Sequence, residues 1–153
     1  MTRLPLIHLH LTSIIGIVQA LKDDLKSGYI ESLTELVHAE IFSDFIEMAD
    51  HLVATGYKDP AAVIAGSTLE SHLKKIAVKN GLPIETNGRP TRAEQINQDL
   101  GKQQIYSLID QKSITAWLDL RNKAAHGNYN EYNIDQVKLL ISGIQNFIMR
   151  NPA

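Results

Sequence analysis

The sequence contains no cysteine, and this absence excludes several kinds of site at once. Without thiols the chain forms no disulfide, no thiolate zinc site and no cysteine nucleophile. We also find no glycine-rich loop of the type that cradles phosphates, no serine-nucleophile elbow and no internal repeat. Any chemistry must therefore come from other residue types.

A long, unbroken apolar run is also missing. The N-terminal apolar stretch follows a single basic residue, Arg3, and is interrupted by His8, His10 and two hydroxyl residues. Such a stretch lacks the continuous apolar core of a signal peptide and is not apolar enough to cross a bilayer. We therefore expect a cytoplasmic protein with no membrane partner.

Histidines are frequent in the first third of the chain, at positions 8, 10, 38 and 51. A metal site needs three or four converging ligands, and the spacing of these residues predicts no compact cluster. We interpret them as surface or ordinary core residues. We therefore expect no metal site among these histidines.

The composition is that of an ordinary globular protein, with 153 residues, 44% of them hydrophobic and 21% charged, and predicts a single domain over residues 1–153. The charge is unevenly distributed. Residues 1–73 carry four Lys or Arg against ten Asp or Glu, whereas residues 74–123 carry nine against five. This asymmetry is compatible with a polyanion-binding face, and equally with two bundle halves that are solvated by opposite charges.

Apolar periodicity predicts an all-α, antiparallel helical bundle of about five to six helices. The expected helices cover residues ~5–26, ~30–55, 60–80, 91–100, ~110–126 and 133 onward. Local residues predict the N-terminal ends of three of these helices. The signals are Asp59-Pro60, a capping box of Thr91 with Glu94, and the cap Asn133 with Gln136. In the first helix the apolar stripe comprises Leu4, Ile7, Leu11, Ile14, Val18, Leu21 and Leu25. In the second helix the residues expected to face inward are Leu33, Leu36, Val37, Ile41, Phe45, Met48, Ala49 and Leu52.

The stretch Leu118–Gly127 carries the most informative polar residues. Arg121 falls inside the apolar stripe of a helix, where an unpaired guanidinium is costly. Asn122 and His126 share a neighbouring polar face and lie one turn apart. On a regular helix Arg121 and His126 point ~140° apart, so they meet one ligand only if the helix frays or a second chain contributes.

A second charged residue, Glu70, also falls on an apolar stripe, in the helix expected over residues 60–80. Isolated buried charges are expensive, and pairing them is the economical solution. We therefore predict an ion pair between Glu70 and Arg121. Gly66 lies one turn before Glu70 and should let another helix approach closely.

Arg121, Asn122 and His126 together resemble the Arg-(four to six residues)-His signature of the HEPN superfamily, which includes RNA-cleaving toxins and antiviral nucleases. The chain from about Ala61 to Ile148 is also similar to small bacterial HEPN-like proteins of unassigned function, chiefly over residues 65–70 and 120–127. The resemblance implies an RNA substrate, a homodimer with the signature in the cleft between protomers, and no metal or organic cofactor.

Two functions follow as hypotheses. In the first, the protein is a metal-independent ribonuclease of the toxin or defence type, in which His126 is the general acid or base, Arg121 offsets phosphate charge, and Asn122 and Glu70 support them. In the second, the same scaffold is a non-catalytic module that binds a protein partner such as an antitoxin, or binds a nucleotide or RNA without cleaving it. An exposed His126 beside Arg121 in a dimer groove favours the first, and a buried, fully bonded His126 favours the second.

Overall fold

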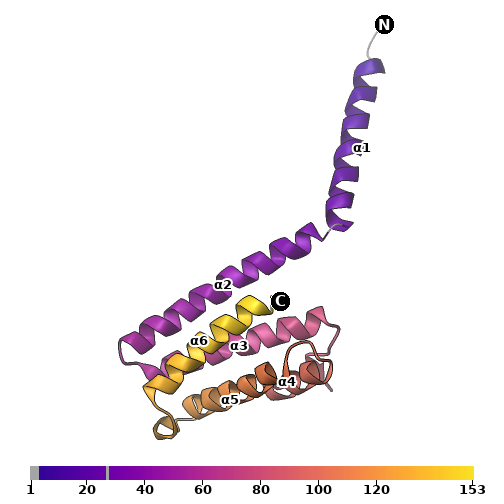
Figure 1. The fold of residues 1–153 in the computed structure, drawn as a ribbon. Helices are drawn as coiled ribbons and strands as arrows, with labels where there is room; N and C mark the ends of the chain where they lie inside the picture. Colours follow the sequence, from indigo (N-terminus) through magenta and orange to yellow (C-terminus); the bar gives the residue numbers. More distant parts are fainter. Residues whose placement is uncertain (1–3, 27) are drawn as a thin grey trace. The chain divides into compact units, whose positions relative to one another are not determined.

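The computed structural model describes residues 4–26 and 28–153, which form six α-helices and one very short hairpin (Figure 1). This architecture confirms the prediction of an all-α helical bundle. The elements in chain order are α1 (Leu4–Lys26), α2 (Tyr29–Ala54), α3 (Lys58–Lys79), β1 (Glu85–Thr86), β2 (Arg89–Pro90), α4 (Ala93–Lys102), α5 (Leu108–Ala125), the 3₁₀ turn η1 (Tyr129–Glu131) and α6 (Ile134–Arg150).

Internal contacts divide the chain into two units, Met1–Val37 and His38–Ala153. The single domain expected over residues 1–153 stays a prediction beside this division. In the second unit, α3 is the central element and packs against α4, α5 and α6. Within the described ranges, no helix has both the length and the apolar character needed to cross a bilayer.

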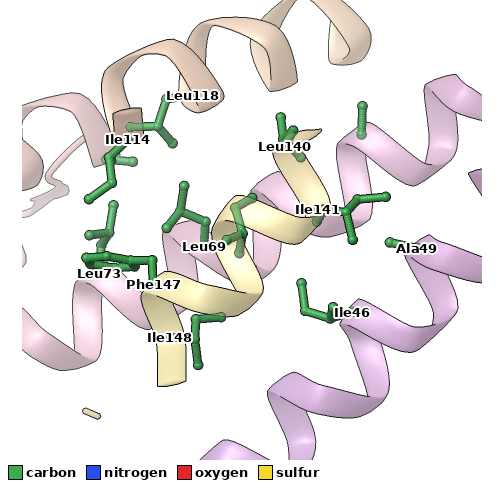
Figure 2. Packing of buried hydrophobic residues seen from close by; sticks show 14 of the residues in the cluster. Ile46, Ala49, Leu69, Leu73, Ile114, Leu118, Leu140, Ile141, Phe147 and Ile148 are labelled. Carbon is green, nitrogen blue, oxygen red and sulfur yellow. The ribbon is translucent and has the colours of Figure 1, made fainter. Parts of the chain in front are cut away.

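The hydrophobic core of the second unit is built mainly from α2, α3, α5 and α6 (Figure 2), and α4 adds Ala93, Ile96 and Leu100. Leu69 and Leu73 of α3 are completely buried, as are Ile114 and Leu118 of α5. The C-terminal part of α2 and the inward face of α6 close the core, and the residues they bury include Ile46, Ala49, Leu140, Ile141, Phe147 and Ile148. This core holds α3 and α5 together, and both of these helices carry predicted site residues.

The predicted inward face of α2 is wrong by about one residue. Ile41, Phe45 and Met48 are exposed, as are Leu36 and Val37 nearer the N-terminus, while Ala49 is buried as expected. The buried residues are Phe42, Ile46 and Val53 together with Ala49, and Leu52 is half-buried against the core, in agreement with its prediction. A shift of one position rotates the buried face by ~100°, and both faces of α2 are apolar enough to satisfy helical periodicity. The side chain of Leu33 lies outside the described residues.

The helix starts are only partly as predicted. α3 begins at Lys58, so Asp59 and Pro60 lie inside its first turn, and Asp59 accepts a hydrogen bond from the hydroxyl of Tyr132. The capping box of Thr91 with Glu94 is wrong, because Arg92 is the N-cap of α4 and makes no side-chain cap bond. The box of Asn133 with Gln136 is confirmed in both directions at the start of α6.

His72 on α3 is a buried polar residue that the sequence analysis did not single out. Its side chain is 2% exposed and lies edge-on between the rings of Phe42 and Phe147. Its Nε2 is 2.7 Å from the carbonyl oxygen of Asn151, which ties the C-terminal end of the chain to α3. Burial lowers the pKa of His72 to about 4, and the charge of Lys75 lowers it further, against the opposing effect of the Asn151 carbonyl.

We expect the stability of the fold to decrease as the pH falls from about 6.5 to about 4, because the unfolded chain protonates His72 before the folded chain does. Between pH 7 and pH 4.5 this linkage costs roughly 2 kcal/mol of unfolding free energy. Urea unfolding at the two pH values measures it. His72→Leu should lose this part of the pH dependence, and His51→Leu, at an exposed histidine, should keep it.

Candidate functional site

The predicted ion pair between α3 and α5 is present. Nη2 of Arg121 donates to Oε2 of Glu70, and the two side chains are 19% and 26% exposed. Lys74, one turn further along α3, donates to the other oxygen of Glu70 at 3.0 Å. One carboxylate therefore balances two cations. Nε of Arg121 is buried without a hydrogen-bond partner, so the guanidinium can meet a ligand only through its terminal nitrogens.

Gly66 allows the close approach of α3 to α5 that brings Glu70 and Arg121 together. A Cβ atom at Gly66 would lie 2.3 Å from Cγ of Arg121 and 2.4 Å from its Cβ. These atoms are at the root of the side chain, so they cannot move without moving α5. The absence of a side chain at position 66 therefore determines where the guanidinium lies.

We expect Gly66→Ala to destabilise the protein by about 1–3 kcal/mol, the usual cost of overpacking, and to displace Arg121 from Glu70. Thermal or urea unfolding measures the change. Gly101→Ala is the matched control, because a Cβ there meets the amide end of Gln111, which can rotate away. An alanine at position 66 that is tolerated as well as one at position 101 would contradict this account of the helix contact.

Asn122 makes a contact that the sequence did not predict. Its Nδ2 donates to Oε1 of Glu94 at 2.8 Å, which joins α5 to the start of α4. Burial acts to raise the pKa of Glu94, but the hydrogen bond from Asn122 and the charges of Arg121 and Arg92 outweigh it and lower the pKa. Glu94 is thus an ionised neighbour of Arg121. The spacing of Thr91 and Glu94 predicts a capping box, but the carboxylate of Glu94 instead accepts a hydrogen bond from Asn122.

His126 lies at the C-cap of α5, one residue after the helix ends at Ala125. Its backbone N–H still donates to the carbonyl of Asn122 at 3.0 Å, and the chain then turns at Gly127 with a φ of +81°. The side chain is exposed, and no hydrogen bond joins its imidazole to any residue that the structure describes. Both ring nitrogens are therefore available to a ligand. Exposure is one part of the condition for catalysis, and the other part, a place beside Arg121 in a dimer groove, stays a prediction.

The site therefore combines two side chains held by contacts between helices with one exposed histidine. Glu70 and Glu94 hold Arg121 and Asn122 from α3 and α4, while His126 stands free at the end of α5. No hydrogen bond links Arg121 or the Asn122 side chain to the His126 imidazole among residues 4–26 and 28–153. The arrangement offers one fixed cation, Arg121, and one accessible imidazole, His126. Around a regular helix these two side chains point ~140° apart, and no hydrogen bond or ion pair within the described residues brings them together.

The lysines and arginines around the hairpin are only partly available to an anion. Lys74 forms an ion pair with Glu70, and the ammonium of Lys75 lies 4.6 Å from the ring centroid of Phe42. Arg89 in β2 and Arg92 at the N-cap of α4 are both exposed. Within the described part of the chain, no group of three or more His, Asp or Glu could hold a metal ion. The side chains of His8 and His10 lie outside the described residues.

In comparisons with known proteins, no family model, curated protein or solved structure matches the chain.

Proposed function

We propose that the protein is a metal-independent endoribonuclease of the HEPN type. The observation that carries the proposal is an exposed His126, without a hydrogen bond to any described residue, one helical turn beyond Asn122. On the same helix Glu70 of α3 holds Arg121, and Glu94 of α4 holds Asn122. Phosphodiester cleavage needs a group that exchanges protons near neutral pH and a cation that stabilises the pentavalent phosphate. Histidine and arginine are the residue types that suit these two tasks.

The proposed reaction uses the 2′-hydroxyl of the RNA as its nucleophile. The 2′-oxygen bonds to phosphorus while the bond from phosphorus to the 5′-oxygen breaks. The products are a 2′,3′-cyclic phosphate and a 5′-hydroxyl. His126 either removes the proton from the 2′-hydroxyl or delivers one to the departing 5′-oxygen, and Arg121 stabilises the phosphorane through a terminal nitrogen. Glu70 and the pair of Asn122 with Glu94 are positioning residues in this mechanism.

The proposal includes a homodimer. Within one chain, Arg121 and His126 point ~140° apart around the helix, so they do not readily contact the same phosphate. In a two-fold dimer the two copies of the motif lie opposite each other, and one copy can supply the arginine while the other supplies the histidine. This arrangement also provides two histidines, one for each of the two proton transfers.

Incubation of the purified protein with total RNA in EDTA tests the proposal. We expect cleavage to persist in EDTA and to leave 2′,3′-cyclic phosphate and 5′-hydroxyl ends. An oligonucleotide with a single 2′-deoxy sugar at the cleaved position should stay intact at that position. Failure of the protein to cut any RNA, or a requirement for a divalent metal, would contradict the mechanism.

A second candidate function is a non-catalytic interaction module, which would bind a protein partner such as an antitoxin, or a nucleotide or RNA. The observation that favours it is that Glu70, Arg121 and Asn122 are all engaged in contacts between helices, which is also how polar residues fix the register of a bundle. Retained RNA binding by a protein that leaves RNA uncut would select this function over the nuclease.

A further inference from the structure

α1 presents a broad apolar face to solvent. The structure describes its side chains from Thr12 to Asp23, and every one of them is exposed. The large aliphatic residues among them are 57–68% exposed and comprise Ile14, Ile15, Ile17, Val18 and Leu21. Four of these five fall within a ~100° arc of the helix. A helix with such a face is only marginally stable in water by itself, so this face needs a partner.

The sequence of α1 has the spacing of a coiled coil. Leu4, Ile7, Leu11, Ile14, Val18, Leu21 and Leu25 follow one another at alternating intervals of three and four residues. This is a period of 3.5 residues, sustained over the whole length of the helix Leu4–Lys26. A strict 3.5-residue repeat suits a helix that winds around another helix, because it keeps one seam facing the partner. The side chains of Leu4, Ile7, Leu11 and Leu25 lie outside the described residues.

We propose that α1 pairs with α1 of a second copy of this chain, in a coiled-coil contact that makes the protein a homodimer. The proposal does not depend on RNA cleavage. It concerns a surface distinct from the site at Arg121 and His126, and it adds a contact between the N-terminal helices to the one proposed at that site.

The described apolar area of α1 is close to that of a small dimer interface. Its five large aliphatic side chains are 57–68% exposed. Complete burial of such a side chain removes ~60–120 Å² from water, so five that are more than half exposed offer roughly 270 Å². Since apolar atoms make up ~57% of a typical interface, this corresponds to about 470 Å² per copy. Two copies reach roughly 950 Å², close to the ~1,000 Å² that a specific interface should bury.

The charge pattern favours a second copy over a membrane. Residues 4–21 contain no Asp, Glu, Lys or Arg. In a two-fold interface a surface meets itself, and an uncharged face does so without repulsion. A helix that lies on an anionic membrane usually has Lys and Arg along its polar face, whereas the two lysines of α1 are matched by two aspartates. A lipid surface also places no requirement on a strict 3.5-residue repeat.

Light scattering or analytical ultracentrifugation of the full chain tests the pairing. We expect the wild type to have twice the 17.0 kDa mass of one chain. Val18→Glu places a charge in the seam of both copies and should raise the dimer dissociation constant by on the order of 100-fold or more. Gln19→Glu is the matched control, because it adds the same charge one position away, on the side of the helix opposite most of the apolar face, and should leave the dimer intact.

Because the chain has no native cysteine, a single introduced cysteine reports on the contact directly. Ile14 lies near the middle of the seven-residue stripe, so Ile14→Cys should form a disulfide between copies in either helix direction. Leu21→Cys should do so only if the helices run parallel, and Gln19→Cys should not do so at all. Circular dichroism of each variant checks that the helical content is unchanged.

Several results would overturn the proposal. These are a wild-type monomer at high concentration, a dimer that Val18→Glu leaves unchanged, or an Ile14→Cys variant that forms no disulfide between copies. Binding of the monomer to phosphatidylcholine–phosphatidylglycerol vesicles, abolished by Val18→Glu, would instead assign the face to a membrane surface. Because these readouts are mass, cross-linking and vesicle binding, a failure of RNA cleavage leaves them unaffected.

Discussion

Replacing His126 by alanine is expected to slow RNA cleavage by on the order of 10²–10⁴-fold, the usual contribution of a general acid or base. The fold should not change, because the His126 side chain is exposed and makes no hydrogen bond to the described residues. Cleavage of a defined RNA in EDTA measures the rate, and urea unfolding measures the stability. The expected outcome is a large loss of rate at unchanged stability.

His51→Ala is the matched control for this prediction, because His51 is also an exposed histidine in a helix but lies on α2, which contributes no predicted site residue. Its rate should equal that of the wild type. If His126→Ala cleaves RNA at the wild-type rate, His126 is not the acid or base. If both variants slow cleavage equally, the effect belongs to histidine loss in general and not to the site.

The second large effect is expected at the ion pair between α3 and α5. Glu70→Gln should lower the unfolding free energy by roughly 3 kcal/mol, near the low end of the range for breaking a buried pair, because both side chains keep some exposure. The loss arises mainly because Arg121 keeps its charge in a half-buried position with its principal partner removed. Chemical denaturation of the wild type and the variant measures it.

Lys74→Ala tests whether the loss is specific to the buried partner. It removes the more exposed of the two cations that contact Glu70 and should cost less than about 1 kcal/mol, as exposed pairs within a helix do. The double variant Glu70→Leu with Arg121→Met should recover most of the stability, since apolar residues often replace an ion pair without cost. This double variant should be stable but should not cleave RNA, because it lacks Arg121. Such a result would separate the structural role of Arg121 from its proposed catalytic role.

The ion pair and the close contact at Gly66 were both predictable from sequence. Glu70 and Arg121 each occupy a position inside an apolar stripe, and a charge in such a position needs a partner of opposite sign. Glu70 and Arg121 are the residues at which a charge falls on the apolar stripe in the two stretches 65–70 and 120–127, so each is the natural partner of the other. The free state of His126 was not predictable, because exposure at a helix end depends on the path of the chain after Gly127 and on what packs above it.

The role of Glu94 shows the limit of local signals. A glutamate three residues after Thr91 is a typical capping residue, and nothing nearby in sequence points to Asn122, which lies 28 positions later. The burial of His72 is similar, because its neighbours Phe42 and Phe147 come from helices distant in sequence. In each case the deciding contact is formed only after the helices pack.

Residue patterns along the chain are enough to predict that it is helical, roughly where each helix begins and ends, and that Glu70 pairs with Arg121. These properties depend on residues within one or two turns of each other, through apolar periodicity, glycine at left-handed positions and the box at Asn133. The tertiary structure alone decided which side of α2 is buried and what Glu94 binds. Periodicity describes the faces of a helix, but the choice between two apolar faces about 100° apart depends on the shape of the surface that packs against them.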